Sequence, residues 1–243
     1  MAEVSGKKSS TSRRPGLRAD ARRNRDQLLV AARDVFVEHG PDAPLDEIAR
    51  RAGVGIATLY RRFPDRESLM RGVALDVLGR AAREARRAQA EEPDAFRALA
   101  RYMHRALDVR ISAVLPALLG RISFEDEEIR HAREEAAEPV QRLIDAAQTD
   151  GSLRPDVAFG DIGLLLVRLS RPLPGSFPRA LDTALAHRHL ELLLDGLRGD
   201  TAGRSAEGLS GPAMSLADLQ AVAPEPAAAD ASTAGERKSR PAR

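Results

Sequence analysis

Hydrophobic positions recur along most of this chain at the spacing of amphipathic α-helices. Leu29, Ala32 and Phe36 repeat in this way within residues 21–39, and Gly40 ends the segment. No stretch alternates between apolar and polar residues as a half-buried β-strand would. The pattern therefore predicts an all-α protein.

Two short helices are predicted next, with Gly53 between them. Ile48 belongs to the apolar face of the first of them. Ile56, Leu59 and Phe63 are predicted to form the buried face of the second, which a proline then ends. Because a glycine supplies the tight turn and both helices offer apolar residues to one another, the spacing is that of a helix-turn-helix.

Longer helices are predicted in the rest of the chain. These helices cover residues 66–90, 93–107, 111–122, 125–149, 157–170 and 179–198. Asp156 is the expected N-cap of the helix at 157–170. The composition shifts to Ala, Gly, Ser and Pro after residue 200. The expected organisation is a disordered basic arm at 1–20, a unit with the helix-turn-helix at 21–66, a helical body at 67–199, and a disordered tail at 200–243, in which 214–222 could form a transient helix turn.

The second short helix of the pair has an outward face suited to a DNA groove. Gly55 and Ala57 are small enough for close approach, and hydrogen-bond donors stand beside them. A plain helical hairpin with a solvated face is the alternative. The donors are Thr58, Tyr60, Arg61 and Arg62.

Residues 44–70, PLDEIARRAGVGIATLYRRFPDRESLM, resemble the DNA-binding core of the tetracycline-repressor (TetR) family of bacterial transcription regulators. The resemblance covers about residues 21–72. It implies an N-terminal three-helix DNA-binding domain, here residues 21–66, followed by a helical effector-binding and dimerisation domain, here residues 67–199. That second domain would bind a small effector and dimerise through its last two helices, near 157–170 and 179–198. Carried onto this chain, it implies phosphate contacts by Thr58 and Tyr60, base-edge contacts by Ile56, Ala57 and Arg61, and backbone contacts by Arg62 and Arg66.

Two positions depart from the family pattern. Many members have Ser where Gly55 stands and Thr where Pro44 stands, so two side-chain hydroxyls are missing here. Residues 1–25 carry eight basic residues against two acidic ones, a net charge of +6, whereas the rest of the chain carries −4. This arm could supply compensating phosphate contacts, or it could be a solubilising tail.

Composition excludes several other kinds of site. The 243 residues include no cysteine, which rules out disulfides, thiolate metal sites and cysteine nucleophiles. No nucleotide-binding loop or nucleophile motif occurs, so we expect no enzymatic activity and no cofactor. Two clusters have a spacing that could suit metal ligands, but solvated helix faces are the favoured interpretation, and no metal is expected. They are His104 with Asp108, and Glu128 with His131 and Glu135.

The predicted function is that of a ligand-responsive transcriptional regulator. We expect a homodimer that binds a palindromic operator in double-stranded DNA, acts as a repressor and is released by a small-molecule effector. No motif assigns effector-binding residues, although an apolar core around Met103, Leu118 and Leu166 is a candidate. With no membrane span or signal sequence evident, the expected location is the bacterial cytoplasm, with nucleoid association when DNA is bound. The alternatives are an architectural DNA-binding protein without effector, and a helical small-molecule-binding protein with a vestigial DNA-binding head.

Overall fold

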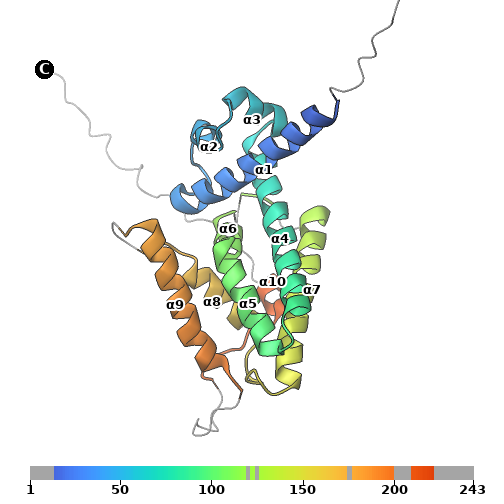
Figure 1. The fold of residues 1–243 in the computed structure, drawn as a ribbon, viewed down its shortest axis with the longest axis vertical. Coiled ribbons are helices and arrows are strands. Elements are labelled where there is room, and N and C mark those ends of the chain that lie inside the picture. The colour runs from blue at the N-terminus through green and yellow to red at the C-terminus, as the bar shows by residue number, and fades with distance from the viewer. Residues whose placement is uncertain (1–13, 119–120, 124–125, 174–176, 200–208, 222–243) are drawn as a thin grey trace, which may run out of the picture.

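The computed structural model of the chain describes residues 14–118, 121–123, 126–173, 177–199 and 209–221 (Figure 1). Within these residues the regular elements are all α-helices, which confirms the predicted all-α class. The helices are α1 (Arg14–His39), α2 (Leu45–Arg51), α3 (Ile56–Arg62), α4 (Arg66–Glu91), α5 (Ala95–Asp108), α6 (Ile111–Leu118), α7 (Glu127–Thr149), α8 (Phe159–Leu169), α9 (Arg179–Leu197) and α10 (Leu216–Ala221).

The terminal boundaries differ from those predicted. Helix α1 begins at Arg14, so part of the expected disordered arm at 1–20 is helical. Residues 1–13 lie outside the described residues. At the other end, 200–208 and 222–243 also lie outside them, but 209–221 is described and contains α10, which packs against α8.

Asp156 is not the N-cap of α8, contrary to the prediction. Helix α8 begins at Phe159, and the Asp161 carboxylate accepts a hydrogen bond from the Ala158 N–H at 2.8 Å. The Asp156 carboxylate instead accepts two hydrogen bonds from the Arg154 guanidinium, at 2.8 and 2.7 Å. This pairing, with a hydrogen bond from the Leu209 N–H, holds the pKa of the Asp156 carboxyl well below its ordinary value.

Helices α1, α2 and α3 form a head above the remaining helices (Figure 1). Leu28 and Phe36 of α1 are fully buried, as is Ile48 of α2. Helix α4 begins at the head and runs down into the body, so one continuous helix connects the two parts.

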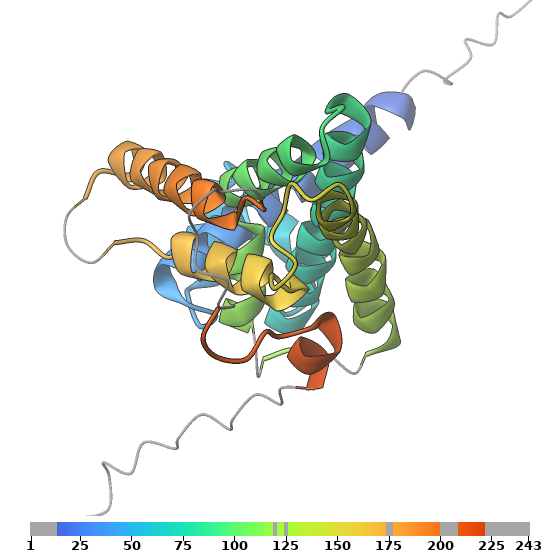
Figure 2. The same ribbon diagram turned by 90° about the horizontal axis from the view of Figure 1, so that it is seen from below.

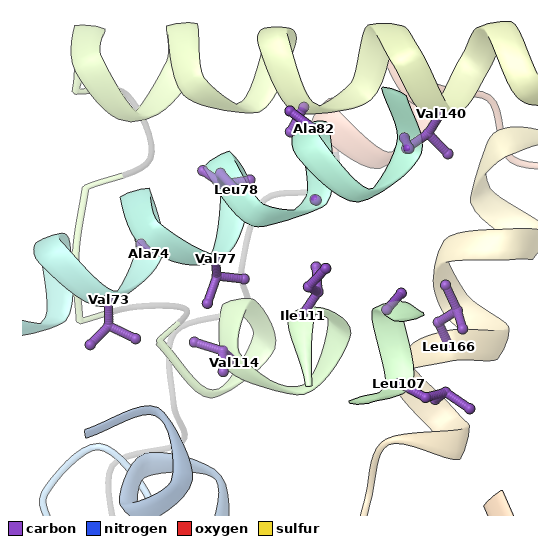
Figure 3. Close-up of a cluster of buried hydrophobic side chains, with 14 of the residues drawn as sticks. Val73, Ala74, Val77, Leu78, Ala82, Leu107, Ile111, Val114, Val140 and Leu166 are labelled. Carbon is purple, nitrogen blue, oxygen red and sulfur yellow. The ribbon is translucent and has the colours of Figure 1, made fainter. Parts of the chain in front are cut away.

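The body core is built around α4, which packs against α7, α5 and α6. Figure 3 shows Val77 of α4 and Val114 of α6 pointing toward one another, while Leu78 and Ala82 lie on the side facing α7. All four of these side chains are buried. Because apolar burial is the main favourable term in folding, this cluster fixes the helices of the body around α4.

Helices α8 and α9 lie next to each other at one side of the body (Figure 2). Leu190 and Leu194 of α9 are buried, and α9 packs mainly against α5. Other leucines of the pair point to solvent. The exposed side chains are Leu164 of α8 and Leu181 and Leu192 of α9.

A histidine pair joins α5 to α9. The Nδ1 atoms of His104 and His187 are 2.8 Å apart, and the ring planes lie within 12° of parallel. The His187 Nε2 is 3.0 Å from an Asp108 carboxylate oxygen. Two ring nitrogens in hydrogen-bond contact require one donor and one acceptor, so the pair accommodates at most one positive charge.

Acidification is expected to lower the stability of the fold through this pair. Burial, followed by the nearby His187 charge, lowers the pKa of His104 from its ordinary 6.5. The unfolded chain then binds more protons than the folded chain, so the stabilisation is present above about pH 6.5 and is lost as the pH falls through the folded pKa. We expect the wild-type Tm to drop between pH 7.5 and 5.5, and the drop to be smaller in His104→Gln. The matched control is His131→Gln, which alters an exposed histidine of α7. Equal pH dependence in the wild type and His104→Gln would contradict the assignment.

Candidate DNA-binding site

The turn between α2 and α3 is built on Gly53. Its φ of 68° lies in the left-handed region, which glycine enters at little cost. The Gly53 N–H donates to the Arg50 carbonyl at 3.1 Å, and the Val54 N–H donates to the Ala49 carbonyl at 3.0 Å. The turn therefore closes the end of α2 and reverses the chain into α3, as the sequence predicted.

The inner face of α3 is smaller than predicted. Leu59 is fully buried and Phe63, at the C-terminal end of the helix, is 5% exposed, but Ile56 is 41% exposed. Assigning Ile56 to the buried face was therefore wrong. Helix α3 has only seven residues, and its first residue extends past the edge of the head core, with exposed Gly55 and Ala57 on either side.

The exposed face of α3 brings together most of the predicted DNA-contacting residues. Tyr60 is 49% exposed, Arg61 and Arg62 are exposed, and Thr58 is half-buried. Within the described part of the chain, no ion pair engages the guanidinium of Arg61 or Arg62. These two cations are thus available to a phosphate or a base edge.

Arg66 is placed differently from the residues of α3. Its Nη1 donates to the carbonyl oxygens of Pro41 at 2.8 Å and Ala43 at 2.7 Å. It lies in the first turn of α4, which Asp65 caps by accepting a hydrogen bond from the Ser68 N–H. Arg66 therefore links the start of α4 to the loop before α2 by two hydrogen bonds.

One basic residue of α1 that sequence reasoning counted only as part of the arm lies against the site. The Arg25 guanidinium is 5.9 Å from the centre of the Phe63 ring, a cation–π distance. It therefore covers the end of α3. The 3.6-residue period of a helix indicates that Arg25 lies on the exposed side of α1. It does not indicate the contact with Phe63, which is 38 positions later in the chain and is brought close only by the fold.

The missing hydroxyl at position 55 leaves α3 without a side-chain cap. Gly55 is the N-cap, with φ −71° and ψ 148°, and a Cβ added there meets nothing within 4 Å. Gly55→Ser is therefore expected to raise the free energy of unfolding by a few tenths of a kcal/mol, because a hydroxyl would accept from the α3 N–H groups. Urea denaturation measures this change, with Gly55→Ala as the control that adds a Cβ without a hydroxyl. A stabilisation shared by both variants would show that the hydroxyl contributes nothing.

The candidate effector core lies in the body. Met103, Leu118 and Leu166 are buried side chains of the body core. The Arg121 guanidinium, three residues past the end of α6, pairs with the Asp42 carboxylate, so it reaches toward the head.

Neither cluster with metal-like spacing forms a metal site in the described residues, where no group of three or more such ligands comes together. His131 and Glu135 form an exposed ion pair of 3.4 Å. None of the helices that the structure describes is long and apolar enough to cross a membrane.

Family models match both parts of the chain. Residues 28–73 match the model described as bacterial regulatory proteins, tetR family. Residues 93–199 match the model of the C-terminal domain of SbtR-like transcriptional regulators. The first match spans most of the head and the beginning of α4, and the second spans α5 to α9.

A solved structure matches over nearly its whole length. The TetR transcriptional regulator SCO0520 from Streptomyces coelicolor is 34% identical, with a TM-score of 0.53, and the match covers 73% of this chain and 99% of that protein. Two curated relatives from Mycolicibacterium smegmatis are each 42% identical over 26% of this chain: the transcriptional repressor LfrR and the transcriptional activator FasR. The matches span 33% and 29% of those two relatives. With both domains matched by regulator families and a 34% identical relative covered almost completely, this chain belongs to the TetR family of bacterial transcriptional regulators.

Proposed function

We propose that the protein is a DNA-binding transcriptional regulator that reads an operator through α3. The observation that carries this proposal is the exposed face of α3, where Tyr60, Arg61 and Arg62 stand on a helix held by buried Leu59 and Phe63. A short helix of this kind can enter the major groove and place side chains against base edges. Ile56 and Ala57, exposed at the start of α3, would lie nearest the groove floor with Gly55, and Thr58 would contact a phosphate.

The protein acts as a homodimer on a palindromic operator. Exposed leucines on adjacent α8 and α9 support this assembly, because an apolar surface on two neighbouring helices favours pairing with a second copy. The side chains concerned are Leu164, Leu181 and Leu192. Two α3 helices related by two-fold symmetry would meet major grooves about 34–36 Å apart, or a multiple of this distance.

A small-molecule effector releases the protein from DNA. A structure of LfrR, 25% identical with a TM-score of 0.54, was solved in complex with proflavine, which supports a ligand site in a body of this fold. The effector would enter the apolar core of the body and favour one of two dimer states. The factor by which the effector changes DNA affinity cannot exceed the ratio of its own affinities for those two states.

Repression is the favoured outcome, because a dimer bound across a promoter excludes other proteins. LfrR is a named repressor and FasR a named activator, so both outcomes occur among relatives of the head. An architectural DNA-binding protein without effector and a vestigial head remain the alternatives. Arg61 and Arg62, which are exposed and form no ion pair with the residues that the structure describes, argue against a vestigial head.

Selection of bound fragments from the source genome, at two salt concentrations, tests the proposal. We expect one or a few palindromic sites that survive the higher salt. Enrichment without sequence preference would support the architectural alternative, and no enrichment would support a vestigial head. Genes beside the selected sites then indicate which compounds to add as effectors in the same experiment.

Removing residues 1–13 is expected to weaken DNA binding and reduce its salt dependence. This truncation removes Lys7, Lys8 and Arg13 but keeps α1, which begins at Arg14. Each lost phosphate contact lowers the slope of log K against log salt concentration by about 0.9. Fluorescence anisotropy across a salt series measures the slope, and substitution of the three basic residues by Gln in the full chain is the control. An unchanged slope would show that the arm does not touch DNA.

A further inference from the structure

Two arginines lie at the junction of the head and the body, where α1 packs against α4 and α6. Arg33 comes from α1, and Arg110 stands in the turn between α5 and α6. Arg110, Arg80 and the carboxylates of Asp34 and Asp76 all act electrostatically on Arg33, so these groups share one small region.

Arg33 is 91% buried, since only 9% of it is exposed, yet two of its donors are unsatisfied. Its Nε and Nη1 are shielded from solvent and have no hydrogen-bond partner among the described residues. The nearest carboxylate oxygen, on Asp34, is 3.8 Å from Nε, too far for a hydrogen bond. Burial lowers the pKa of Arg33, but a guanidinium stays charged in proteins. A buried charge without hydrogen bonds is costly, which points to a partner that completes it.

Arg110 carries a second donor of the same kind. Its Nη1 is buried and has no partner within the described part of the chain. Its φ of 52° makes it the one non-glycine residue with positive φ in that part, at a position just past the end of α5 where glycine is the usual residue. Keeping an arginine there costs conformational energy, so its side chain has a role that glycine could not fill.

Other arginines already engage the carboxylates around the pair. Arg179 of α9 bridges Asp34 at 3.2 Å and Glu38 at 3.3 Å. Arg80 pairs with Asp76 at 2.8 Å. The local acids are thus largely neutralised, and Arg33 and Arg110 leave an excess of positive charge at the junction.

We propose that Arg33 and Arg110 form a binding site for a small oxyanion, which accepts hydrogen bonds from Arg33 Nε and Nη1 and from Arg110 Nη1. Guanidinium groups suit phosphate, sulfate and carboxylate oxygens because their donors form a planar fork. The bound anion ties α1 to the turn that begins α6, and so it holds the head in one orientation relative to the body. This second site is separate from α3 and from the apolar core of the body.

Isothermal titration of phosphate, sulfate and succinate into the full-length protein, at constant ionic strength set with chloride, tests the site. We expect saturable binding in the wild type and in Arg97→Gln, which alters an exposed arginine of α5. Binding should weaken at least tenfold in Arg33→Gln and in Arg110→Gly. Preference for phosphate and sulfate assigns an inorganic oxyanion, whereas preference for succinate assigns a carboxylate metabolite. No saturable binding of any of the three, or equal binding in all four proteins, would overturn the proposal and leave water as the partner of these donors.

Arg110→Gly separates the site from a purely structural role. Glycine relieves the positive φ, so this variant should keep or raise the wild-type Tm measured in chloride. It should also lose the additional rise in Tm that phosphate gives the wild type. An equal phosphate effect in wild type and Arg110→Gly would reflect general salt exclusion and would overturn the proposal. These measurements use no DNA, so failure of this site and failure of the proposed regulator function are distinguishable.

Discussion

Replacing Tyr60 and Arg61 together with alanine is expected to abolish selective binding of operator DNA while leaving the fold intact. Tyr60 is 49% exposed and Arg61 is exposed, so neither supports the head core. A good bidentate contact to a base contributes about 1–3 kcal/mol of discrimination. Loss of one such contact and of a neighbouring phosphate contact should weaken operator binding by on the order of 100-fold.

The single variants then separate the two roles. If Arg61 reads a base, Arg61→Ala relaxes sequence preference at one operator position and changes the salt slope little. If Tyr60 contacts a phosphate, Tyr60→Phe weakens binding to all sequences equally. Fluorescence anisotropy with the selected operator and a scrambled duplex measures both effects, with Arg97→Ala on α5 as the control. Operator affinity unchanged in the double variant would show that α3 does not read the DNA.

Local chemistry made much of the head predictable. Gly53 is a turn residue whose positive φ follows from its lack of a side chain. Leu59 lies on α3, Phe63 is the C-cap residue four positions later, and both are buried. Each inference needed only residues within a few positions, where spacing along the chain determines which side chains share a face.

The incorrect assignments depended on partners that spacing does not specify. Ile56 fits the apolar period of α3, but the short helix leaves the core before its first residue. Asp156 fits an N-cap pattern, but Arg154 and the distant Leu209 N–H take its carboxylate. The contact of Arg66 with the DNA backbone stays a prediction, but Arg66 also donates to carbonyls 23 and 25 residues earlier, which spacing does not indicate either. Contacts of this range are set by packing of the whole domain, so no local pattern signals them.

The proposed anion site at the junction could not be predicted from the sequence either, because it also depends on tertiary packing. Arg33 stands four residues after Leu29 and three before Phe36, on the buried side of α1, but the sequence does not show whether its charge finds a partner there. Arg110 follows a predicted helix end, where an arginine is unremarkable until its φ is known. The proposed anion site thus depends on positions where tertiary packing overrides local preference, as expected for sites that carry strain or unsatisfied polar groups.

Gly72→Ala and Gly79→Ala, two identical changes on α4, are expected to alter stability in opposite directions. A Cβ at Gly72 would lie 2.9 Å from Phe63 Cε1 and 3.4 Å from Leu29 Cδ2, two buried side chains. Overpacking of this kind costs about 1–3 kcal/mol, which exceeds the gain of up to about 1 kcal/mol from replacing a helical glycine. A Cβ at Gly79 meets only the flexible end of Arg83, at 3.1 Å, so that variant keeps the gain.

The same pair of variants tests the coupling of α4 to the recognition helix. Phe63 ends α3, so displacing its ring shifts the helix that we propose reads DNA. Gly72→Ala should therefore lower the Tm by about 2–4 °C for each kcal/mol lost and should also weaken operator binding. Gly79→Ala should raise the Tm and leave operator affinity unchanged. Thermal unfolding and anisotropy on both variants measure these effects. A Gly72→Ala protein as stable as Gly79→Ala would mean that Phe63 is free to move and that α4 does not position α3 through this contact.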